Sequence, residues 1–236
     1  MDVTKKLLEL DPTLTRHNEG FWQDPYDPTK LGYSSFNDAG IEVETGEFMY
    51  SMVRMLKPKR VLETGTHWGV GAAYMAMALK ENGEGHLDTV EFLPEIHKKA
   101  VQRMTKLELT PFVTCHLGDV KDFDPHYAAG NNPVDPSPYQ LILLDTEPQT
   151  RFDELLKFEP YLANGGFIFI HDLHRHMHQI PNEEHGFAWP YGKIPWKMRA
   201  LVLEGKLRPF HFGTPRGYTG FYKVSPDDYP WATKDK

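Results

Sequence analysis

Hydrophobic residues follow two spacings along the chain, and each spacing predicts a different kind of element. Short apolar runs predict strands over 60–63, 86–91, 111–116, 139–145 and 165–171. Apolar residues at helical spacing predict helices over 3–10, 42–56, 70–81, 94–109 and 151–161, with a weaker helix over 119–129. Strands that alternate with helices predict a parallel sheet with helices on both faces.

The last two predicted strands, 207–213 and 220–224, break this alternation. They are joined by the sequence TPRGYT, a turn too short to hold a crossover helix, so they must pair antiparallel. The expected fold class is therefore α/β, with a mostly parallel seven-stranded sheet that ends in a C-terminal antiparallel hairpin.

Two segments fall outside the regular pattern. Residues 1–41 contain a stretch rich in Pro, Asp and aromatic residues, which predicts an irregular N-terminal cap on a main domain of residues 42–236. Residues 173–197 mix aromatic residues, Pro and Gly, and the segment is long for a connection. It is predicted to be a substrate-covering loop.

Composition narrows the possible functions. The net charge of −7 and the scattered Lys and Arg residues argue against a nucleic-acid partner and favour a neutral or cationic small substrate. One cysteine, Cys115, excludes an intrachain disulfide and a cysteine-based zinc site. No apolar run resembles a signal peptide or is long enough to cross a bilayer, so we expect a cytoplasmic protein with no membrane partner.

The strongest local motif is VLETGTHWGVG, residues 61–71, between a predicted strand and a predicted helix. Gly65, Gly69 and Gly71 allow a tight turn and close approach of a ligand at the carboxyl end of the strand. The order G-x-x-x-G-x-G differs from the dinucleotide fingerprint G-x-G-x-x-G. Glu63, just before the turn, would repel a pyrophosphate but attract a sulfonium and an α-ammonium group.

Two further acidic residues follow the next two strands. Glu91 ends the second strand, where a carboxylate can accept hydrogen bonds from both hydroxyls of a ribose. Asp119 follows the third strand in the sequence LGDV and could accept from an adenine amino group. Acids after three successive strands together predict a nucleoside site.

These motifs resemble the class I S-adenosylmethionine-dependent methyltransferases, a family with a single Rossmann-like domain, and within it the catechol and caffeoyl-coenzyme A type O-methyltransferases. The resemblance covers roughly three quarters of the chain, through ETGEF, VLETGTHWGVG, TVEFLPE, LGDV, LILLD and NGGFIFIHD. It implies S-adenosylmethionine as cofactor, a small-molecule methyl acceptor, and a possible homodimer. The expected cofactor-binding residues are Glu63, Gly65, Thr66, His67, Gly69, Gly71, Glu91, Asp119 and Asp145.

The catalytic centre is expected after the fourth and fifth strands. The resemblance implies that Asp145 and Asp172 bind a divalent cation such as Mg²⁺, which would lower the pKa of a substrate hydroxyl. The chain departs from the family pattern at Leu173, in place of an amide ligand, and at Pro148, in place of a basic residue. Histidine can serve as a metal ligand or as a base near neutral pH, so Asp145 and Asp172 with one of His171 or His174 form the preferred catalytic centre.

Three other functions remain open. A nicotinamide-dependent oxidoreductase would share the sheet and the glycine turn, although the glycine order and Glu63 disfavour it. A nucleic-acid methyltransferase is disfavoured because DTEP stands after the fourth strand in place of an Asp/Asn-Pro-Pro-aromatic motif. A non-catalytic protein that binds the cofactor as a structural or sensing ligand is the third.

Overall fold

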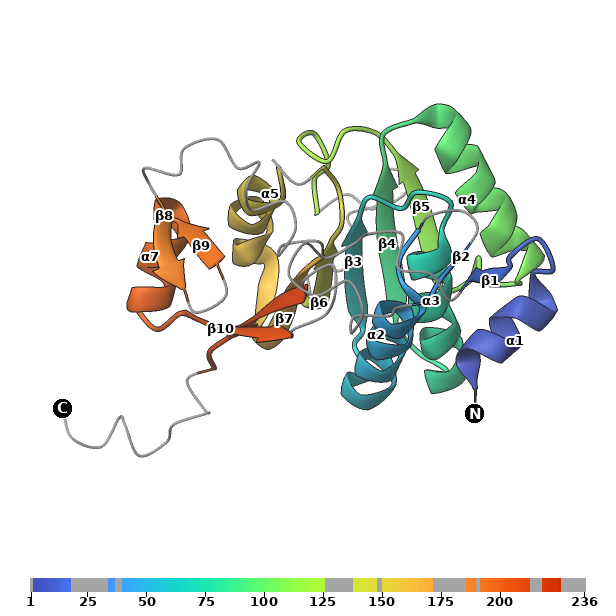
Figure 1. Cartoon of the computed structure of the whole chain (residues 1–236), viewed down its shortest axis with the longest axis horizontal. Helices are drawn as coiled ribbons and strands as arrows, with labels where there is room; N and C mark the ends of the chain where they lie inside the picture. The colour runs from blue at the N-terminus through green and yellow to red at the C-terminus, as the bar shows by residue number, and fades with distance from the viewer. Residues whose placement is uncertain are drawn as a thin grey trace. The chain divides into compact units, whose positions relative to one another are not determined.

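The computed structural model describes residues 2–17, 34–36, 40–125, 138–147, 150–171, 186–189, 192–212 and 218–225. The chain divides into two compact units, Met1–Pro136 and Ser137–Lys236. Figure 1 labels most of their helices and strands. Among the described residues, seven strands make up the main sheet, three from the first unit and four from the second.

The first unit contains three parallel strands, β3 (Arg60–Thr64), β4 (His86–Glu91) and β5 (Val113–Leu117). The helices α2 (Val43–Leu56), α3 (Val70–Asn82) and α4 (Pro94–Lys106) alternate with them. Helix α3 is buried over its first ten residues. Its run of Ala and Met carries no polar face, as expected for a helix enclosed by other elements.

The N-terminal segment is tied to the helices of this unit. Helix α1 (Val3–Leu10) places Thr4 against the Tyr74 hydroxyl at 2.7 Å and against Glu47, and its Lys6 donates to Glu81 at 2.9 Å. Strands β1 (Arg16–His17) and β2 (Ser35–Phe36) pair antiparallel after it. The described part of the predicted cap is therefore held by specific polar contacts.

The second unit contains the parallel pair β6 (Tyr139–Leu144) and β7 (Leu162–His171). Strand β11 (Tyr218–Lys223) runs antiparallel to β7, and β10 (Leu207–Phe212) runs antiparallel to β11. An aromatic cluster joins these strands, and Gly220 makes room for it. A Cβ at Gly220 would lie 2.2 Å from the ring of Phe210, so only glycine allows that ring to cross the strand.

The remaining elements of the second unit are α5 (Arg151–Phe158), a 3₁₀ turn η1 (Glu159–Tyr161), and α7 (Trp196–Leu203). An antiparallel hairpin, β8 (Gly186–Trp189) and β9 (Gly192–Pro195), lies within the predicted substrate-covering loop. The sequence showed no periodicity there, so the hairpin was not predicted. The role of the loop as a cover stays a prediction.

The predicted fold class, a mostly parallel sheet of seven strands with a C-terminal antiparallel hairpin, is confirmed. The weak helix predicted over 119–129 is wrong in its described part, which forms turns up to Pro125. The Asp119 carboxylate accepts the backbone N–H of Lys121 at 2.8 Å and so competes with helix formation. Among the described residues, no helix is both long and apolar enough for a membrane span.

Candidate functional site

The glycine loop between β3 and α3 has the backbone conformation that its sequence predicts. Gly65 and Gly69 both have a φ of 81°, in the left-handed region that favours glycine, and Gly69 is the N-cap of α3. His67 also has a positive φ, 49°, although it carries a side chain. Non-glycine residues in this region are found preferentially at functional sites, where surrounding contacts hold them.

Glu63 lies at the end of β3 with only 2% of its surface exposed. Its Oε2 accepts a hydrogen bond of 2.5 Å from the Thr89 hydroxyl, which in turn accepts one of 2.6 Å from Thr66. A Cβ at Gly71 would lie 2.5 Å from Oε1 of Glu63. Gly71 therefore lets the first turn of α3 pack against this carboxylate. Thr89 was missed from the sequence, where its only signal is a polar residue inside a buried strand.

Glu91 ends β4 and is 8% exposed. Its Oε2 accepts the backbone N–H of His67, and its Oε1 accepts that of Leu93, both at 2.9 Å. The carboxylate thus joins the glycine loop to the segment that starts α4. A carboxylate offers roughly four acceptor positions, so Glu91 can still accept hydrogen bonds from a ligand.

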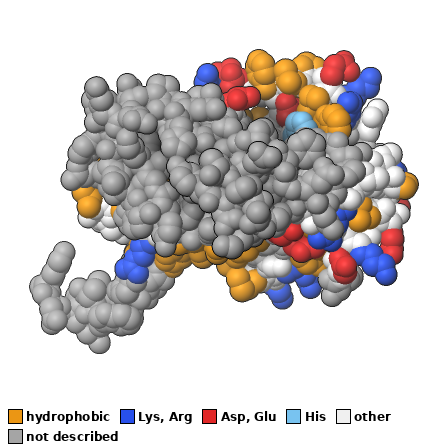
Figure 2. All heavy atoms as spheres, in the orientation of Figure 1, with side chains coloured by type: hydrophobic (Ala, Val, Ile, Leu, Met, Phe, Trp, Pro, Cys, Tyr) orange, Lys and Arg blue, Asp and Glu red, His pale blue; other side chains and the backbone are white. Residues whose placement is uncertain are grey.

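Exposed apolar side chains flank the acids at the ends of β4 and β5. Phe92, Leu93 and Leu117 are 62%, 52% and 53% exposed. Hydrophobic side chains are also visible between charged ones at the upper edge of the space-filling view (Figure 2). Apolar surface next to Glu91 and Asp119 suits a flat heterocyclic ring with polar edges. The sequence predicts only the acids here, because the exposure of a side chain cannot be read from the sequence.

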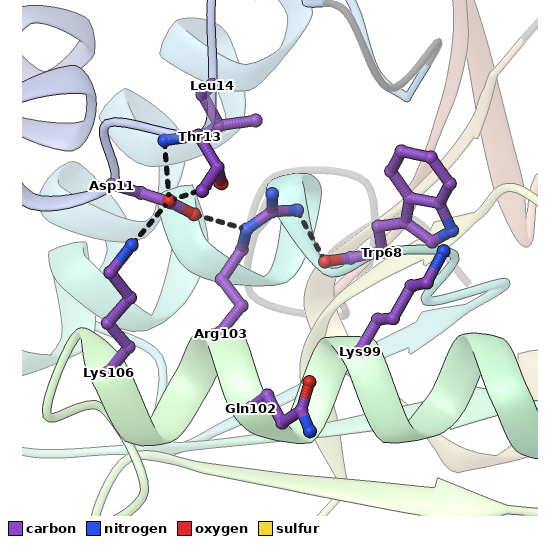
Figure 3. Close-up of a pocket in the computed structure, with 8 residues that line it drawn as sticks. All are labelled: Asp11, Thr13, Leu14, Trp68, Lys99, Gln102, Arg103 and Lys106. Carbon is purple, nitrogen blue, oxygen red and sulfur yellow. Dashed lines mark hydrogen bonds and ion pairs between the residues drawn. The ribbon is translucent and has the colours of Figure 1, made fainter.

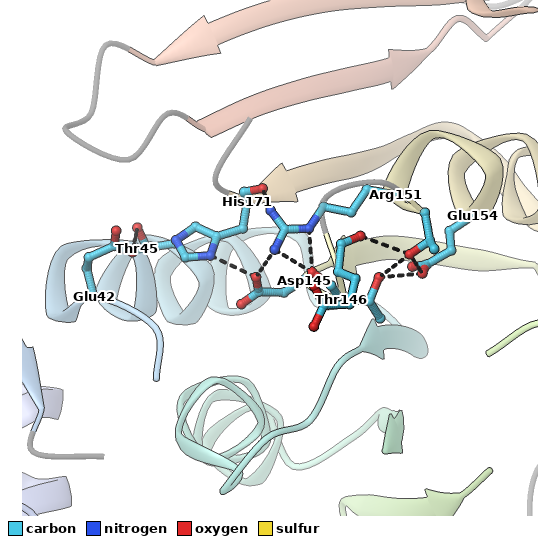
Figure 4. A network of polar contacts seen from close by, with 9 residues as sticks. Glu42, Thr45, Asp145, Thr146, Arg151, Glu154 and His171 are labelled. Carbon is cyan, nitrogen blue, oxygen red and sulfur yellow. Dashed lines mark hydrogen bonds and ion pairs between the residues drawn. The ribbon is translucent and has the colours of Figure 1, made fainter. Parts of the chain in front are cut away.

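A second polar cluster lies in the second unit, at the carboxyl ends of β6 and β7 (Figure 4). The Nδ1–H of His171 donates to Oδ1 of Asp145 at 2.9 Å, and the guanidinium of Arg151 donates to the same oxygen at 3.2 Å. The Asp145 side chain is 19% exposed, whereas that of His171 is 2% exposed. The cluster brings together two of the three predicted catalytic residues.

Arg151 connects three parts of this cluster. Its Nε donates to the backbone oxygen of Thr146 at 2.8 Å, and a second nitrogen donates to the backbone oxygen of His171. Arg151 was not predicted from the sequence. Its signal was a basic residue in the first turn of a helix, where the helix dipole favours acids.

The other predicted residues of this centre, Asp172 and His174, lie outside the described residues, as do Pro148 and Leu173. Within the described part of the chain, no group of three or more His, Cys, Asp or Glu side chains could hold a metal ion. The partners of Asp145 Oδ1 are hydrogen-bond donors, and such a set does not fit a cation at that oxygen. A cation shared with Asp172 stays a prediction.

Residues 62–173 match a family model described as a methyltransferase domain. A catechol O-methyltransferase of Niastella koreensis is 25% identical over 127 residues, which cover 54% of either chain. A protein-L-isoaspartate O-methyltransferase of Thermosipho melanesiensis is 39% identical over 74 residues, covering 31% of this chain and 36% of the relative. The chain thus spans between about a third and two thirds of the curated relatives that it matches.

Solved structures resemble about four fifths of the chain. The O-methyltransferase TomG from Streptomyces achromogenes, in complex with SAM, has a TM-score of 0.61 at 18% identity, with 80% of this chain and 83% of that chain covered. An O-methyltransferase from Bacillus cereus, in complex with SAH, has a TM-score of 0.57 at 16% identity over 79% and 83%. Residues 62–173 are therefore similar to a methyltransferase domain, and the chain has the fold of O-methyltransferases of known structure.

Proposed function

We propose that this protein transfers the methyl group of S-adenosylmethionine to a hydroxyl group of a small molecule. The observation that carries the proposal is the loop from Glu63 to Gly71, whose carboxylate and backbone are held by Thr89 and Glu91 inside the methyltransferase domain. The net charge of −7 agrees with a neutral or cationic substrate.

In the proposed site, successive strand ends bind different parts of the cofactor. Glu63 attracts the positive charge of the methionine part of the cofactor. The loop N–H groups from Gly65 to Gly69 approach the carboxylate of that methionine part. Glu91 accepts hydrogen bonds from the ribose hydroxyls. Phe92 and Leu93 face the adenine ring, and Asp119 accepts from its amino group. Thr66, His67 and Gly71 complete the site.

Bound S-adenosylmethionine would supply an activated methyl group to the substrate oxygen, and the electron pair of the broken carbon–sulfur bond would stay on the sulfur. The substrate proton passes to the carboxylate of Asp145. A carboxylate is a sufficient base, because an oxygen that has gained a methyl group while still protonated is a much stronger acid than a carboxylic acid. Arg151 and His171 position Asp145 through its Oδ1.

A role for His171 as the base itself would need direct contact with the substrate. The His171 side chain is 2% exposed and its Nδ1–H is directed to Asp145, so His171 acts as a residue that positions Asp145. The predicted role of His174 as the base is retained as an alternative. Substitution of Asp145 tests this alternative. If His174 is the base, Asp145→Asn keeps most of its rate while His174→Gln loses it.

Calorimetry and a methyl-transfer assay test the function. The full chain is titrated with S-adenosylhomocysteine and NAD, then incubated with labelled S-adenosylmethionine and a panel of phenols, catechols, hydroxy acids and amines. We expect saturable binding of S-adenosylhomocysteine and label in an O-methyl product. Binding of NAD alone would support the oxidoreductase. Binding of S-adenosylhomocysteine with no label in any acceptor would support the non-catalytic alternative.

A further inference from the structure

A pocket of about 370 Å³ lies in the first unit beside α4 (Figure 3). A volume of this size is typical of sites for small molecules. Its lining comes from the segment after α1, from the glycine loop and from α4: Asp11, Thr13, Leu14, Trp68, Lys99, Gln102, Arg103 and Lys106. Trp68 belongs to the glycine loop through its backbone, but none of the side chains that line this pocket belongs to the proposed cofactor or catalytic sets.

The charge of this pocket is opposite in sign to that of the whole chain. Its lining has three cationic residues and one acidic residue, a formal charge of +2, in a chain of net charge −7. Asp11 pairs with Arg103 at 2.8 Å and with Lys106 at 2.9 Å, and so fixes the position of both cations. A ligand with about two negative charges would balance the lining.

Two hydrogen-bond donors of the pocket have no acceptor in the described structure. The indole Nε1–H of Trp68 is buried and lacks a hydrogen-bond partner. The Lys99 ammonium lies 4.3 Å from the centroid of the same indole ring, and no carboxylate of the described residues pairs with it. A buried donor without an acceptor is unfavourable, and a turn of the indole toward the pocket would let one anionic oxygen accept from both groups.

We propose that this pocket binds a small phosphorylated molecule, with its phosphate monoester held by Lys99 and the Trp68 Nε1–H. A phosphate monoester carries about −1.5 to −2 charges at neutral pH, which matches the charge of the lining. A single carboxylate would leave about one positive charge unbalanced. Gln102, on the same helix, supplies a further amide donor to the ligand.

The pocket is linked to the glycine loop through Trp68. Arg103 donates to the backbone oxygen of Trp68 at 2.6 Å, and the adjacent N–H of His67 donates to Glu91. A phosphate that rearranges Trp68 therefore acts on the loop that we assign to the cofactor. Binding at one site changes affinity at the other by the same factor in both directions. This coupling rests on the proposed function, whereas binding in the pocket does not.

Calorimetry on the full chain, in Hepes at constant ionic strength, tests the pocket with inorganic phosphate and glycerol 3-phosphate. We expect saturable binding, about tenfold weaker in Lys99→Met and in Trp68→Phe, since each loses one hydrogen bond to a charged group. Lys98→Met, the adjacent lysine of α4 that does not line the pocket, should bind as the wild type does. Thermal unfolding verifies that each variant is folded.

No saturable binding of either probe would overturn the proposal, as would equal affinities of Lys99→Met and Lys98→Met. Vesicles of phosphatidylcholine with and without phosphatidic acid form a separate arm. Retention on the phosphatidic acid vesicles without binding of the free probes would assign the site to a lipid headgroup and contradict a soluble ligand. Phosphate binding in a protein that fails to bind S-adenosylhomocysteine would contradict the proposed function and leave the pocket supported.

Discussion

The backbone N–H of His67 donates to Oε2 of Glu91 at 2.9 Å, so the last residue of β4 holds the centre of the glycine loop. His67 has a positive φ of 49°, a conformation that is unfavourable for a residue with a Cβ. The hydrogen bond to a carboxylate helps to maintain it. Glu91 therefore has two roles in the proposed site, to shape the loop and to bind the ribose.

Glu91→Gln should weaken both roles. The amide has a single acceptor oxygen, whereas the carboxylate accepts from His67 and Leu93 on separate oxygens. We expect a loss of about 1 kcal/mol in the free energy of unfolding and weaker binding of S-adenosylhomocysteine. Denaturant unfolding and calorimetry measure the two effects. Glu95→Gln, on the exposed first turn of α4, is the matched control, and an equal loss of affinity there would contradict the assignment.

Gly71→Ala should weaken cofactor binding, even though alanine favours a helix more than glycine does. The new Cβ would lie 2.5 Å from Oε1 of Glu63, so either the carboxylate or the start of α3 must shift. We expect S-adenosylhomocysteine affinity to fall by at least about tenfold, because the site depends on both. The Ala substitution at Gly83, where a Cβ would meet nothing within 4 Å, controls for the exchange itself, although its φ of 76° adds local strain. Unchanged affinity for S-adenosylhomocysteine in Gly71→Ala would contradict the assignment of Glu63 to the cofactor site.

Arg151 should be required for the reaction beyond its contribution to folding. Arg151→Met removes the hydrogen bonds to Asp145 and to the backbone at the ends of β6 and β7, and we expect kcat to fall by roughly 30-fold or more. Arg151→Lys should recover part of this rate because the charge remains. Lys157→Met, on the same helix, should keep the wild-type rate.

The reaction should persist in EDTA. The positive charge beside Asp145 Oδ1 already comes from Arg151, so we expect the rate to be independent of added metal. A loss of rate in EDTA that Mg²⁺ restores, together with inactivity of Asp172→Ala, would instead support the cation predicted from the sequence.

Asp11 should give the protein a defined acid sensitivity. Burial by itself would raise the pKa of the Asp11 carboxyl, but hydrogen bonds from Thr13, Lys106 and Arg103 outweigh it and hold the pKa well below its usual range. The folded state thus favours the ionised form. Its contribution to stability is complete above the unfolded pKa of about 4 and declines as the pH falls below that value.

Asp11→Asn tests this contribution. We expect it to lower the free energy of unfolding by about 2 kcal/mol at neutral pH, since the nearly buried Arg103 and the partly exposed Lys106 lose their charged acceptor. The difference from the wild type should shrink as the pH falls below about 4. Denaturant titrations at several pH values measure it, and a difference that stays constant with pH would contradict the mechanism.

The sequence by itself determined the order of strands and helices, the glycine turn and the acids at the strand ends. These features follow from local rules. Apolar spacing reports which side of an element is buried, and Gly65 and Gly69 mark the points where the backbone must have a positive φ. The confirmed alternation from β3 to β7 and the closing hairpin follow from the same rules.

Only the tertiary structure decided which polar groups meet. Arg103 and Asp11 are 92 positions apart in the chain, and Asp145 and His171 are 26 apart, so no local pattern reveals either pair. Arg151 lies in no motif, and Trp68 lies in the glycine motif without a predicted role of its side chain. Their importance comes from burial and from partners on other elements, which are set when the chain folds and distant segments pack together.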